Sequence, residues 1–393
     1  MKVFILAGEP SGDNLGGALM AGLKSLVRDI SFVGVGGTRM QAEGLESLFD
    51  MSELSVMGLA EILPRYRSLM ARIDQTAEAV IEAAPDVLIT IDSPDFSLRV
   101  ARRVRARSEL RIVHYVAPTV WAWRPGRARK MARWVDHVLA LFPFEPPFMQ
   151  AAGMECDFVG HPVVAEPVAS AEEAAAFRAE TGIGDAPLLL VLPGSRSGEV
   201  ARLGPVLQQA VARIMAEAPD TRIVIPAAAS VLAEVRRMTR TWEGAPVVLD
   251  PTMPDAATGA VMKRAAFRAA DVALAASGTV SLELAAARTP MVIAYDMSWL
   301  SRQIIGLMLK VDTVTLVNLV SETRAVPEFI GANCRPGPIA RATLDLFDER
   351  STQLAAMEST MRRLGQGGEA PGLRAARAVL RGMGRAEADG QTD

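Results

Sequence analysis

Carboxylates and hydroxyls follow several short apolar runs of this chain, where they could act on a substrate. Asp92 comes directly after the apolar run 87–91 and is followed by Ser93, Pro94 and Asp95. A carboxylate in such a position can accept a proton from a substrate hydroxyl, and general-base assistance is worth roughly 10²–10⁴-fold in rate. Asp95 is expected to cap the helix that follows. Asp92 is therefore the candidate general base.

The segment "GEPSGDNLGG", residues 8–17, also places polar side chains at a strand end. Its glycines depart from the dinucleotide fingerprint G-x-G-x-x-G, but they permit a tight turn and close packing of a helix on a strand. Glu9 and Ser11 would project from the carboxyl end of the strand, whereas Asp13 or Ser11 could cap the helix. A purely structural turn remains the alternative.

Two loops in the second half of the chain have the residue types that bind phosphate. The first is "LPGSR", with Ser195 and Arg196, and the second is "ASGTVSLE", with Ser277, Gly278, Thr279 and Glu283. Backbone amides at a strand–helix turn and an arginine fork suit a phosphate, and Glu283 would then hydrogen-bond a ribose. The alternative is a capping box in which Thr279 or Ser281 pairs with Glu283. Taken together, the loops favour nucleotide binding.

Three further features have both a functional and a structural interpretation. Asn318, in an apolar run, either contacts a sugar or phosphate or completes a turn, and His114 is either catalytic or a core residue. From Arg99 to Arg133 the chain has eleven Arg or Lys and one Glu, which indicates an anionic surface or ligand, or a solvated helix face. Residues 56–73 form either a core helix or a helix that contacts lipid. The candidate membrane or acyl contacts are Met57, Leu59, Ile62, Leu63, Trp121, Trp123 and Arg124.

The elements that must position these residues are parallel strands and crossover helices. Apolar runs such as 2–7, 87–91, 188–192 and 272–276 alternate with helical patterns, which predicts an α/β fold with two doubly wound halves. The join falls near 162–172. We expect domains at 1–165 and 170–350, with a C-terminal helix within about 352–382 that packs back on the first. Ligands of such sheets bind beyond the carboxyl ends of the strands, so the cleft between the halves is the expected site.

Bulk composition narrows the function classes. The chain has 393 residues, a formal net charge of −3 and two cysteines, Cys156 and Cys334. This charge gives no reason to expect a nucleic-acid partner, and two cysteines make neither a disulfide framework nor a metal motif. No uncharged run reaches the roughly 18 residues of a membrane span, so we expect a cytoplasmic protein. No D-x-D motif stands at a strand end, and neither a metal nor a cofactor is expected.

Several of these segments together resemble the lipid-A-disaccharide synthase family, which consists of inverting glycosyltransferases of the two-Rossmann-lobe (GT-B) type. The resemblance runs over about residues 2–335 and rests on segments in family order: "AGEPSGD", "VGVGGTRMQAEGLE", "LSVMGLAEILPR", "IDSPDF", "HYVAPTVWAWRPGR", "FPFE", "FVGHP", "LPGSR", "ASGTVSLE", "TPMVIAY" and "VNLV". Pro10 and Val317 are small departures from the family pattern.

The resemblance implies a reaction and a location. UDP-2,3-diacylglucosamine would donate its sugar to the 6-hydroxyl of 2,3-diacylglucosamine 1-phosphate (lipid X), giving a β-1,6 disaccharide 1-phosphate and UDP. The enzyme would attach peripherally to the cytoplasmic face of the inner membrane, and a homodimer is compatible with the family. Asp92, Glu9, Ser11 and Arg196 would be catalytic. The residues expected to bind the UDP-sugar are Ser195, Arg196, Ser277, Gly278, Thr279, Glu283 and Asn318.

Other function classes remain as alternatives to this interpretation. A nucleotide-sugar epimerase on the same two-lobe fold would bind UDP without an acylated acceptor. A non-catalytic module at a membrane surface would not require Asp92 or the two phosphate-type loops. An NAD-dependent oxidoreductase is disfavoured because the glycines of residues 8–17 do not match the dinucleotide fingerprint.

Overall fold

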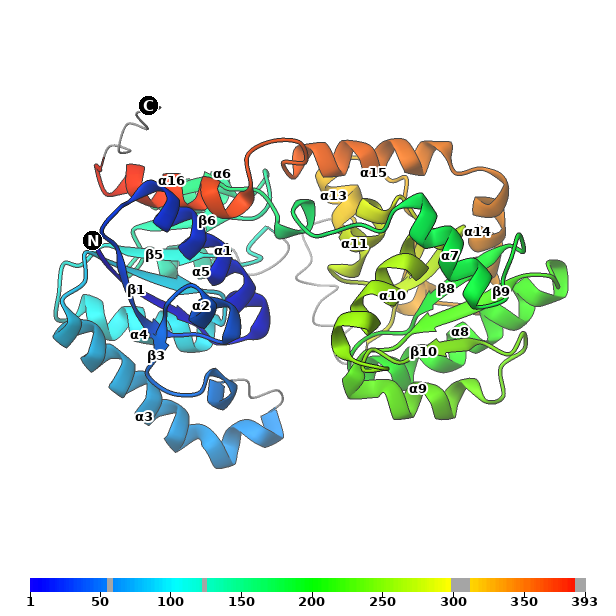
Figure 1. The fold of residues 1–393 in the computed structure, drawn as a ribbon, viewed down its shortest axis with the longest axis horizontal. Helices are drawn as coiled ribbons and strands as arrows, with labels where there is room; N and C mark the ends of the chain where they lie inside the picture. Colours follow the sequence, from blue (N-terminus) through cyan, green and yellow to red (C-terminus); the bar gives the residue numbers. More distant parts are fainter. Residues whose placement is uncertain (55–58, 122–125, 298–311, 386–393) are drawn as a thin grey trace. The chain divides into compact units, whose positions relative to one another are not determined.

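The computed structural model describes residues 1–54, 59–121, 126–297 and 312–385, with the side chains of 59–66 outside the description. The chain forms two compact units (Figure 1). Unit 1 comprises Met1–Ala165 and Leu364–Asp393, and unit 2 comprises Glu166–Arg363. Each unit has its own parallel sheet covered by helices, so the predicted α/β class with two doubly wound halves is confirmed.

Unit 1 is built on a seven-stranded sheet in the order β3-β2-β1-β4-β5-β6-β7. The strands are β1 (Lys2–Ala7), β2 (Ser31–Val35), β3 (Glu46–Ser47), β4 (Val87–Ile91), β5 (Ile112–Tyr115), β6 (His137–Ala140) and β7 (Glu155–Phe158). Every residue of β4 and β5 is buried, because helices cover both faces of a parallel sheet. This burial explains why these strands appear in the sequence as continuous apolar runs.

The helices of unit 1 come from both ends of the chain. They are α1 (Pro10–Leu26), α2 (Thr38–Ala42), α3 (Leu59–Ala83), α4 (Pro94–Arg105), α5 (Gly126–Met131), α6 (Pro146–Gln150) and α16 (Pro371–Gly382). The C-terminal α16 packs on α1 (Figure 1). Small residues allow this contact: a Cβ on Gly22 would lie 2.7 Å from the Gly372 carbonyl oxygen, and one on Gly372 would lie 2.5 Å from that of Ala18.

Unit 2 repeats the architecture with a six-stranded sheet in the order β10-β9-β8-β11-β12-β13. The strands are β8 (Leu188–Leu192), β9 (Arg222–Pro226), β10 (Val247–Leu249), β11 (Val272–Ala276), β12 (Met291–Tyr295) and β13 (Glu328–Ile330). The helices include α7 (Ala171–Glu180), α8 (Ser197–Glu217), α9 (Leu232–Thr239), α10 (Ala256–Ala269), α11 (Val280–Ala287), α13 (Leu316–Ser321), α14 (Pro336–Asp348) and α15 (Ser351–Arg363).

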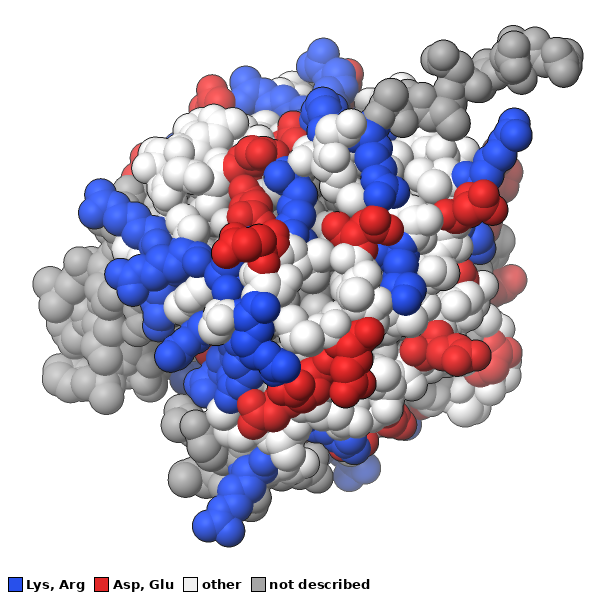
Figure 2. Space-filling view, turned by 90° about the vertical axis from the view of Figure 1, so that its left-hand side faces the viewer, with Lys and Arg blue, Asp and Glu red and all other residues white. Residues whose placement is uncertain are grey.

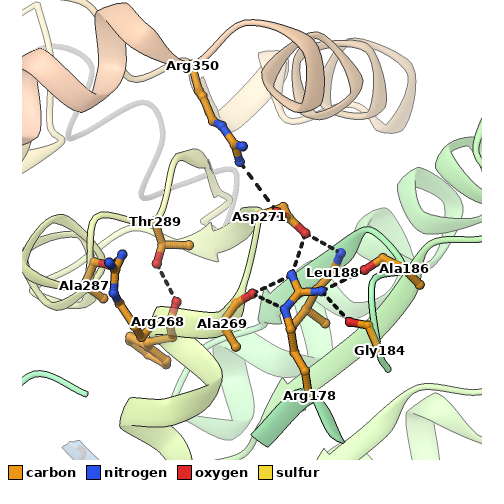
Figure 3. Close-up of polar contacts among 11 residues, drawn as sticks. Arg178, Gly184, Ala186, Leu188, Arg268, Ala269, Asp271, Ala287, Thr289 and Arg350 are labelled. Atoms are coloured by element: carbon orange, nitrogen blue, oxygen red, sulfur yellow. Dashed lines mark hydrogen bonds and ion pairs between the residues drawn. The ribbon is translucent and has the colours of Figure 1, made fainter. Parts of the chain in front are cut away.

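A polar network fastens the amino-terminal edge of this second sheet (Figure 3). Arg178 of α7 donates to the carbonyl oxygens of Ala269, Gly184 and Ala186 at 2.7–3.1 Å. It also donates at 2.7 Å to the carboxylate of Asp271, which accepts a 2.9 Å bond from the Leu188 amide. Charge-assisted bonds of this kind are stronger than neutral ones. The network therefore anchors α7 to the starts of β8 and β11, at the edge opposite the candidate site.

No helix among the residues that the structure describes is long and apolar enough to cross a membrane.

Candidate active site

The strand order of each unit reverses at one point, and the predicted site loops flank it. In unit 1 the reversal lies between β1 and β4, so the loops that carry Glu9 and Asp92 are neighbours. In unit 2 it lies between β8 and β11, which brings the loop with Arg196 next to the loop with Thr279. Open α/β sheets bind ligands at such switch points. The topology thus places both pairs of predicted loops where ligands of this fold class bind.

Asp92 lies in a strained turn between β4 and α4. Its φ is 46° and that of Ser93 is 43°, and side-chain-bearing residues occupy this left-handed region only when the surroundings enforce it. The Asp92 amide donates to the Tyr115 carbonyl at 2.9 Å, and the Ser97 hydroxyl donates to the Asp92 carbonyl at 2.7 Å. Burial raises the pKa of Asp92, although a hydrogen bond from the Ser93 amide opposes this. Strain and a raised pKa are both typical of functional carboxylates.

The predicted cap of α4 is wrong. Ser93 is the residue that precedes the helix, whereas Asp95 lies within its first turn, with its side chain exposed. Pro94 takes the first helical position, where a missing amide proton costs nothing. The left-handed turn at Asp92 and Ser93 therefore starts the helix two residues earlier than a cap at Asp95 would.

The loop after β1 lies against the Asp92 loop. A Cβ on Gly8 would approach the Ser93 hydroxyl oxygen to 2.8 Å, so only glycine allows this contact. Glu9 precedes α1 with a partly buried side chain, and Ser11 is exposed in the first turn of that helix. Neither side chain caps α1 by a hydrogen bond from the helix amides. Glu9 and Ser11 thus stand at the carboxyl edge of the sheet, as the sequence indicated.

Asp13 has a different role from the predicted cap of its own helix. Its carboxylate accepts hydrogen bonds from the backbone amides of Gly37, Arg39 and Met40 at 2.8, 2.9 and 3.1 Å. These amides open α2, where unpaired N–H groups and the helix dipole favour a negative charge. The buried Asp13 therefore fixes the β2–α2 turn to α1, and the expectation that it caps α1 is wrong.

Unit 2 holds a cavity of about 650 Å³ at its switch point. It is lined by the "LPGSR" loop and by the start of α11, which brings together Ser195, Arg196, Ser277, Gly278, Thr279 and Glu283. Both α8 and α11 begin at this cavity, and helix amino termini offer unpaired N–H donors to an anion. The cavity is thus of a size and polarity that suit a nucleoside diphosphate.

The "LPGSR" loop is held by a carboxylate that the sequence reasoning missed. Glu199 accepts a 3.1 Å hydrogen bond from the Ser195 amide and lies 3.5 Å from the Arg196 guanidinium. Gly194 has a φ of 116°, and a Cβ there would lie 2.7 Å from that of Glu199, so the turn requires glycine. Arg196 remains 70% exposed and is therefore available to a ligand.

Glu283 pairs with Lys263 of α10 at 2.5 Å, and both line the cavity. The alternative of a capping box is wrong, because no side chain caps α11 and the Ser281 hydroxyl donates to the Gly278 carbonyl instead. Sequence reasoning missed Lys263 because it lies in the middle of a helix, with no turn or motif beside it. Its Nζ also lies 5.0 Å from the centre of the Phe267 ring, which fixes its direction.

Asn318 lies outside this cavity, in the interior of unit 2. Its side-chain amide donates at 2.9 Å both to the Val326 carbonyl and to the carboxylate of Glu328, and its carbonyl oxygen accepts from the Val326 amide at 3.0 Å. Glu328 also accepts from the backbone amides of Val314 and Thr315. Asn318 thus ties α13 to the segment before β13, and its contact with the UDP-sugar stays a prediction.

His114 is a core residue of β5. Its Nδ1 hydrogen-bonds the Thr90 hydroxyl at 2.7 Å, and burial lowers its pKa to about 4. The imidazole is therefore neutral near pH 7. This geometry matches the structural alternative for His114.

A second carboxylate that the sequence reasoning missed lies in the loop between β6 and α6, directly before α6. Glu145 is buried and accepts hydrogen bonds from the amides of Leu141 and Phe142 at 3.0 and 2.9 Å. Burial raises its pKa to about 7, while the two amides and the Trp121 indole oppose the shift. Phe144 stacks on Phe142 and meets Trp121 edge-on, with ring centroids 5.1 Å apart. The sequence offered one signal for this residue: Glu145 is the last residue of "FPFE" and comes directly after an apolar run.

The expected membrane contacts lie largely outside the described part of the chain. Met57, Trp123 and Arg124 fall outside it, as do the side chains of Leu59, Ile62 and Leu63. Trp121 is partly buried against Phe144. The described half of α3 packs on the core of unit 1 through Ile73, Ala77 and Val80. A lipid contact of the first half of α3 therefore stays a prediction.

Comparison with solved structures identifies proteins that share the fold of this chain. UDP-GlcNAc 2-epimerase from Neisseria meningitidis, bound to UDP-GlcNAc, matches with a TM-score of 0.63 at 12% identity over 98% of this chain and 99% of that one. MurG from Acinetobacter baumannii matches with a TM-score of 0.53 at 14% identity over 96% and 99%. Identities this low show a shared GT-B-like fold and leave the reaction open.

Sequence comparison decides the family. The family model for lipid-A-disaccharide synthetase matches residues 3–377. Lipid-A-disaccharide synthase from Ruegeria pomeroyi is 62% identical over 380 residues, which cover 97% of this chain and 95% of the relative. That from Rhodospirillum centenum is 45% identical over 386 residues, covering 97% and 94%. The chain therefore belongs to the lipid-A-disaccharide synthase family of glycosyltransferases.

Proposed function

We propose that this chain transfers 2,3-diacylglucosamine from UDP to the 6-hydroxyl of 2,3-diacylglucosamine 1-phosphate, with Asp92 as the general base. The family assignment supports the reaction, since it covers nearly the whole chain. The observation that carries the role of Asp92 is its position: a partly buried carboxylate on a strained backbone turn at the switch point of unit 1. A single displacement with inversion then needs only a base for the attacking hydroxyl and stabilisation of the leaving UDP.

The raised pKa of Asp92 suits this role. A base works best when its pKa approaches the operating pH while it is still ionised, and partial burial moves a carboxyl in that direction. Glu9 and Ser11 lie on the neighbouring loop and would orient the acceptor or the donor sugar. They would act beside the base, because Gly8 keeps that loop against Ser93.

The donor would bind in the cavity of unit 2. Arg196, Lys263 and the amino-terminal amides of α8 and α11 would offset the charge of the pyrophosphate. Glu283, already held by Lys263, would accept hydrogen bonds from the ribose hydroxyls. Among the described residues, no cluster of three or more His, Cys, Asp or Glu could hold a metal ion. Activity that survives a chelator would support this charge compensation by the protein alone.

Attachment to the cytoplasmic face of the inner membrane and assembly into a homodimer belong to the same proposal. Both substrates carry acyl chains, so the enzyme must reach them at a lipid surface. The amphipathic start of α3 and the region of Trp121 and Trp123 would provide the contact. Sedimentation with vesicles and light scattering would test the two statements separately.

The decisive experiment mixes purified protein with UDP-2,3-diacylglucosamine, with and without the phosphorylated acceptor. We expect UDP release only when the acceptor is present. Release or interconversion of the donor sugar without acceptor would favour the epimerase alternative, which the fold also permits. Asp92→Asn should then lower kcat at least a hundredfold while the fold is kept; near-normal turnover would remove Asp92 from the role of base.

A further inference from the structure

A groove of about 930 Å³ lies on unit 1, between α3, α4 and α5. Five cationic side chains line it: Arg99, Arg102, Arg103, Arg127 and Lys130. Asp95 is the one acidic side chain among its lining residues. Figure 2 views the side of unit 1 at the left of Figure 1 and shows blue side chains gathered on part of that face. The groove therefore attracts an anion strongly.

Four of the five cations of the groove have no carboxylate partner among the described residues, unlike two neighbouring arginines outside it. Arg105 and Arg107, on and just after α4 but outside the groove, pair with Asp136 and Glu78. Inside the groove Arg103 pairs with Asp74. By contrast, the charges of Arg102, Arg127 and Lys130 have no carboxylate partner among the residues that the structure describes, and Arg99 contacts only the Met70 sulfur, at 3.6 Å.

The rest of the groove is apolar and begins beside the candidate base. Its apolar lining residues are Met70, Leu98, Met131 and Trp134. The groove therefore combines cationic side chains that can bind an anion with an apolar surface that can contact the uncharged part of the same ligand. Pro94 also lines the groove. Pro94 is two residues from Asp92, and two residues span at most about 7.6 Å between Cα atoms, so this end lies near Asp92. Successive groove residues of α4 then lead away from Asp92 at ~1.5 Å per residue.

From this arrangement we propose that the groove binds the phosphate of the acceptor glycolipid. The proposal rests on the proposed function, because the acceptor must present its hydroxyl to Asp92. Asp95, at the same end, would accept a hydrogen bond from a sugar hydroxyl. Arg99, four residues and ~6 Å farther along the helix, Arg102, Arg127 and Lys130 would hold the phosphate at the other side of the sugar ring. Guanidinium groups bind phosphate through paired, charge-assisted hydrogen bonds. The groove thereby selects a phosphorylated acceptor and orients it.

The test compares three variants of the full-length protein. Arg127→Gln and Lys130→Gln each remove a groove charge, whereas Arg129→Gln removes the same charge from an exposed residue of α5 that does not line the groove. Initial rates are measured in neutral detergent micelles with the acceptor and with the same diacylated sugar lacking its phosphate. We expect the two groove variants to raise KM for the phosphorylated acceptor about 10- to 100-fold, with kcat changed much less. Arg129→Gln should match wild type.

The acceptor without phosphate separates phosphate recognition from a general loss of activity. With this acceptor, the groove variants should have the same kcat/KM as the wild type, whatever its value. If all three variants and the wild type have equal KM values for the phosphorylated acceptor, the inference is wrong. Turnover by the wild-type protein would in that case still support the proposed function. Absence of wild-type UDP release would instead refute the proposed function itself.

A second measurement distinguishes the acceptor from membrane phospholipid as the source of the phosphate. Sedimentation is measured with vesicles that contain phosphatidylglycerol. If the groove variants lose vesicle binding but keep the wild-type KM in neutral micelles, the groove binds lipid headgroups and the inference is wrong. If vesicle binding persists while KM rises, the acceptor phosphate is the ligand.

Discussion

Asp13 joins two elements of unit 1 through three hydrogen bonds to a single carboxylate, so its replacement should destabilise that unit. One oxygen accepts from the amides of Gly37 and Met40, and the other accepts from the Arg39 amide. Asp13→Ala leaves all three donors without this partner. A buried donor left unsatisfied costs about 1–3 kcal/mol, and water can reach the two partly buried amides. We therefore expect a loss of roughly 3–5 kcal/mol.

Asp13→Asn offers a graded comparison. The asparagine carbonyl oxygen can keep the two bonds from Gly37 and Met40, but its NH₂ group then faces the Arg39 amide, donor against donor. The expected loss is about 1–2 kcal/mol. For a unit of this size, 1 kcal/mol corresponds to about 2–4 °C in Tm, so Asp13→Ala should melt about 6–20 °C below wild type.

Calorimetry and amide hydrogen exchange check this prediction. The exchange of the amides of residues 37–40 should accelerate in Asp13→Ala before that of β8 and β11 in unit 2. Asn14→Ala, an exposed neighbour on α1, is the matched control and should leave Tm unchanged. A Tm of Asp13→Ala within about 2 °C of wild type would refute the view that this carboxylate fixes the start of α2.

Three further predictions follow from the described contacts. Because burial raises the pKa of Asp92, protonation of the base should lower kcat/KM as the pH falls, with a midpoint above the ordinary aspartate pKa. A midpoint at or below that ordinary pKa would contradict burial as the cause. Lys263→Ala should weaken UDP binding about tenfold or more, because it removes a cation and frees Glu283; calorimetric titration that gives an unchanged Kd would exclude Lys263 from the donor site. Burial raises the pKa of Glu145 from the ordinary glutamate value of 4.5 to about 7 in the folded protein, so its contribution to stability is fully present below pH 4.5 and is lost as the pH rises through 7. Denaturant titrations should show wild type losing up to ~3 kcal/mol across this window relative to Glu145→Gln, and parallel curves would show that Glu145 is not responsible.

Much of the fold was predictable because parallel strands are buried on both faces. The runs 87–91 and 188–192 have no polar residue except Thr90, and the structure makes both of them strands. Short strands with few apolar residues were harder to recognise. Glu155–Phe158 and Glu328–Ile330 pair at sheet edges, where one side of the strand has no neighbour and the sequence keeps charged residues.

The positions of Glu9, Asp92, Arg196 and Thr279 at strand ends could be predicted from the sequence, because glycine, proline and hydroxyl residues mark where a buried strand must stop. The sequence also determined the family, through motifs in a fixed order. Partners from distant segments were decided only by the tertiary structure. Lys263 reaches Glu283 from another helix, Asp13 binds amides at residues 37–40, and α16 closes on α1. Such contacts depend on which strands become neighbours in the sheet, and local sequence has no periodicity or turn signal that encodes that order.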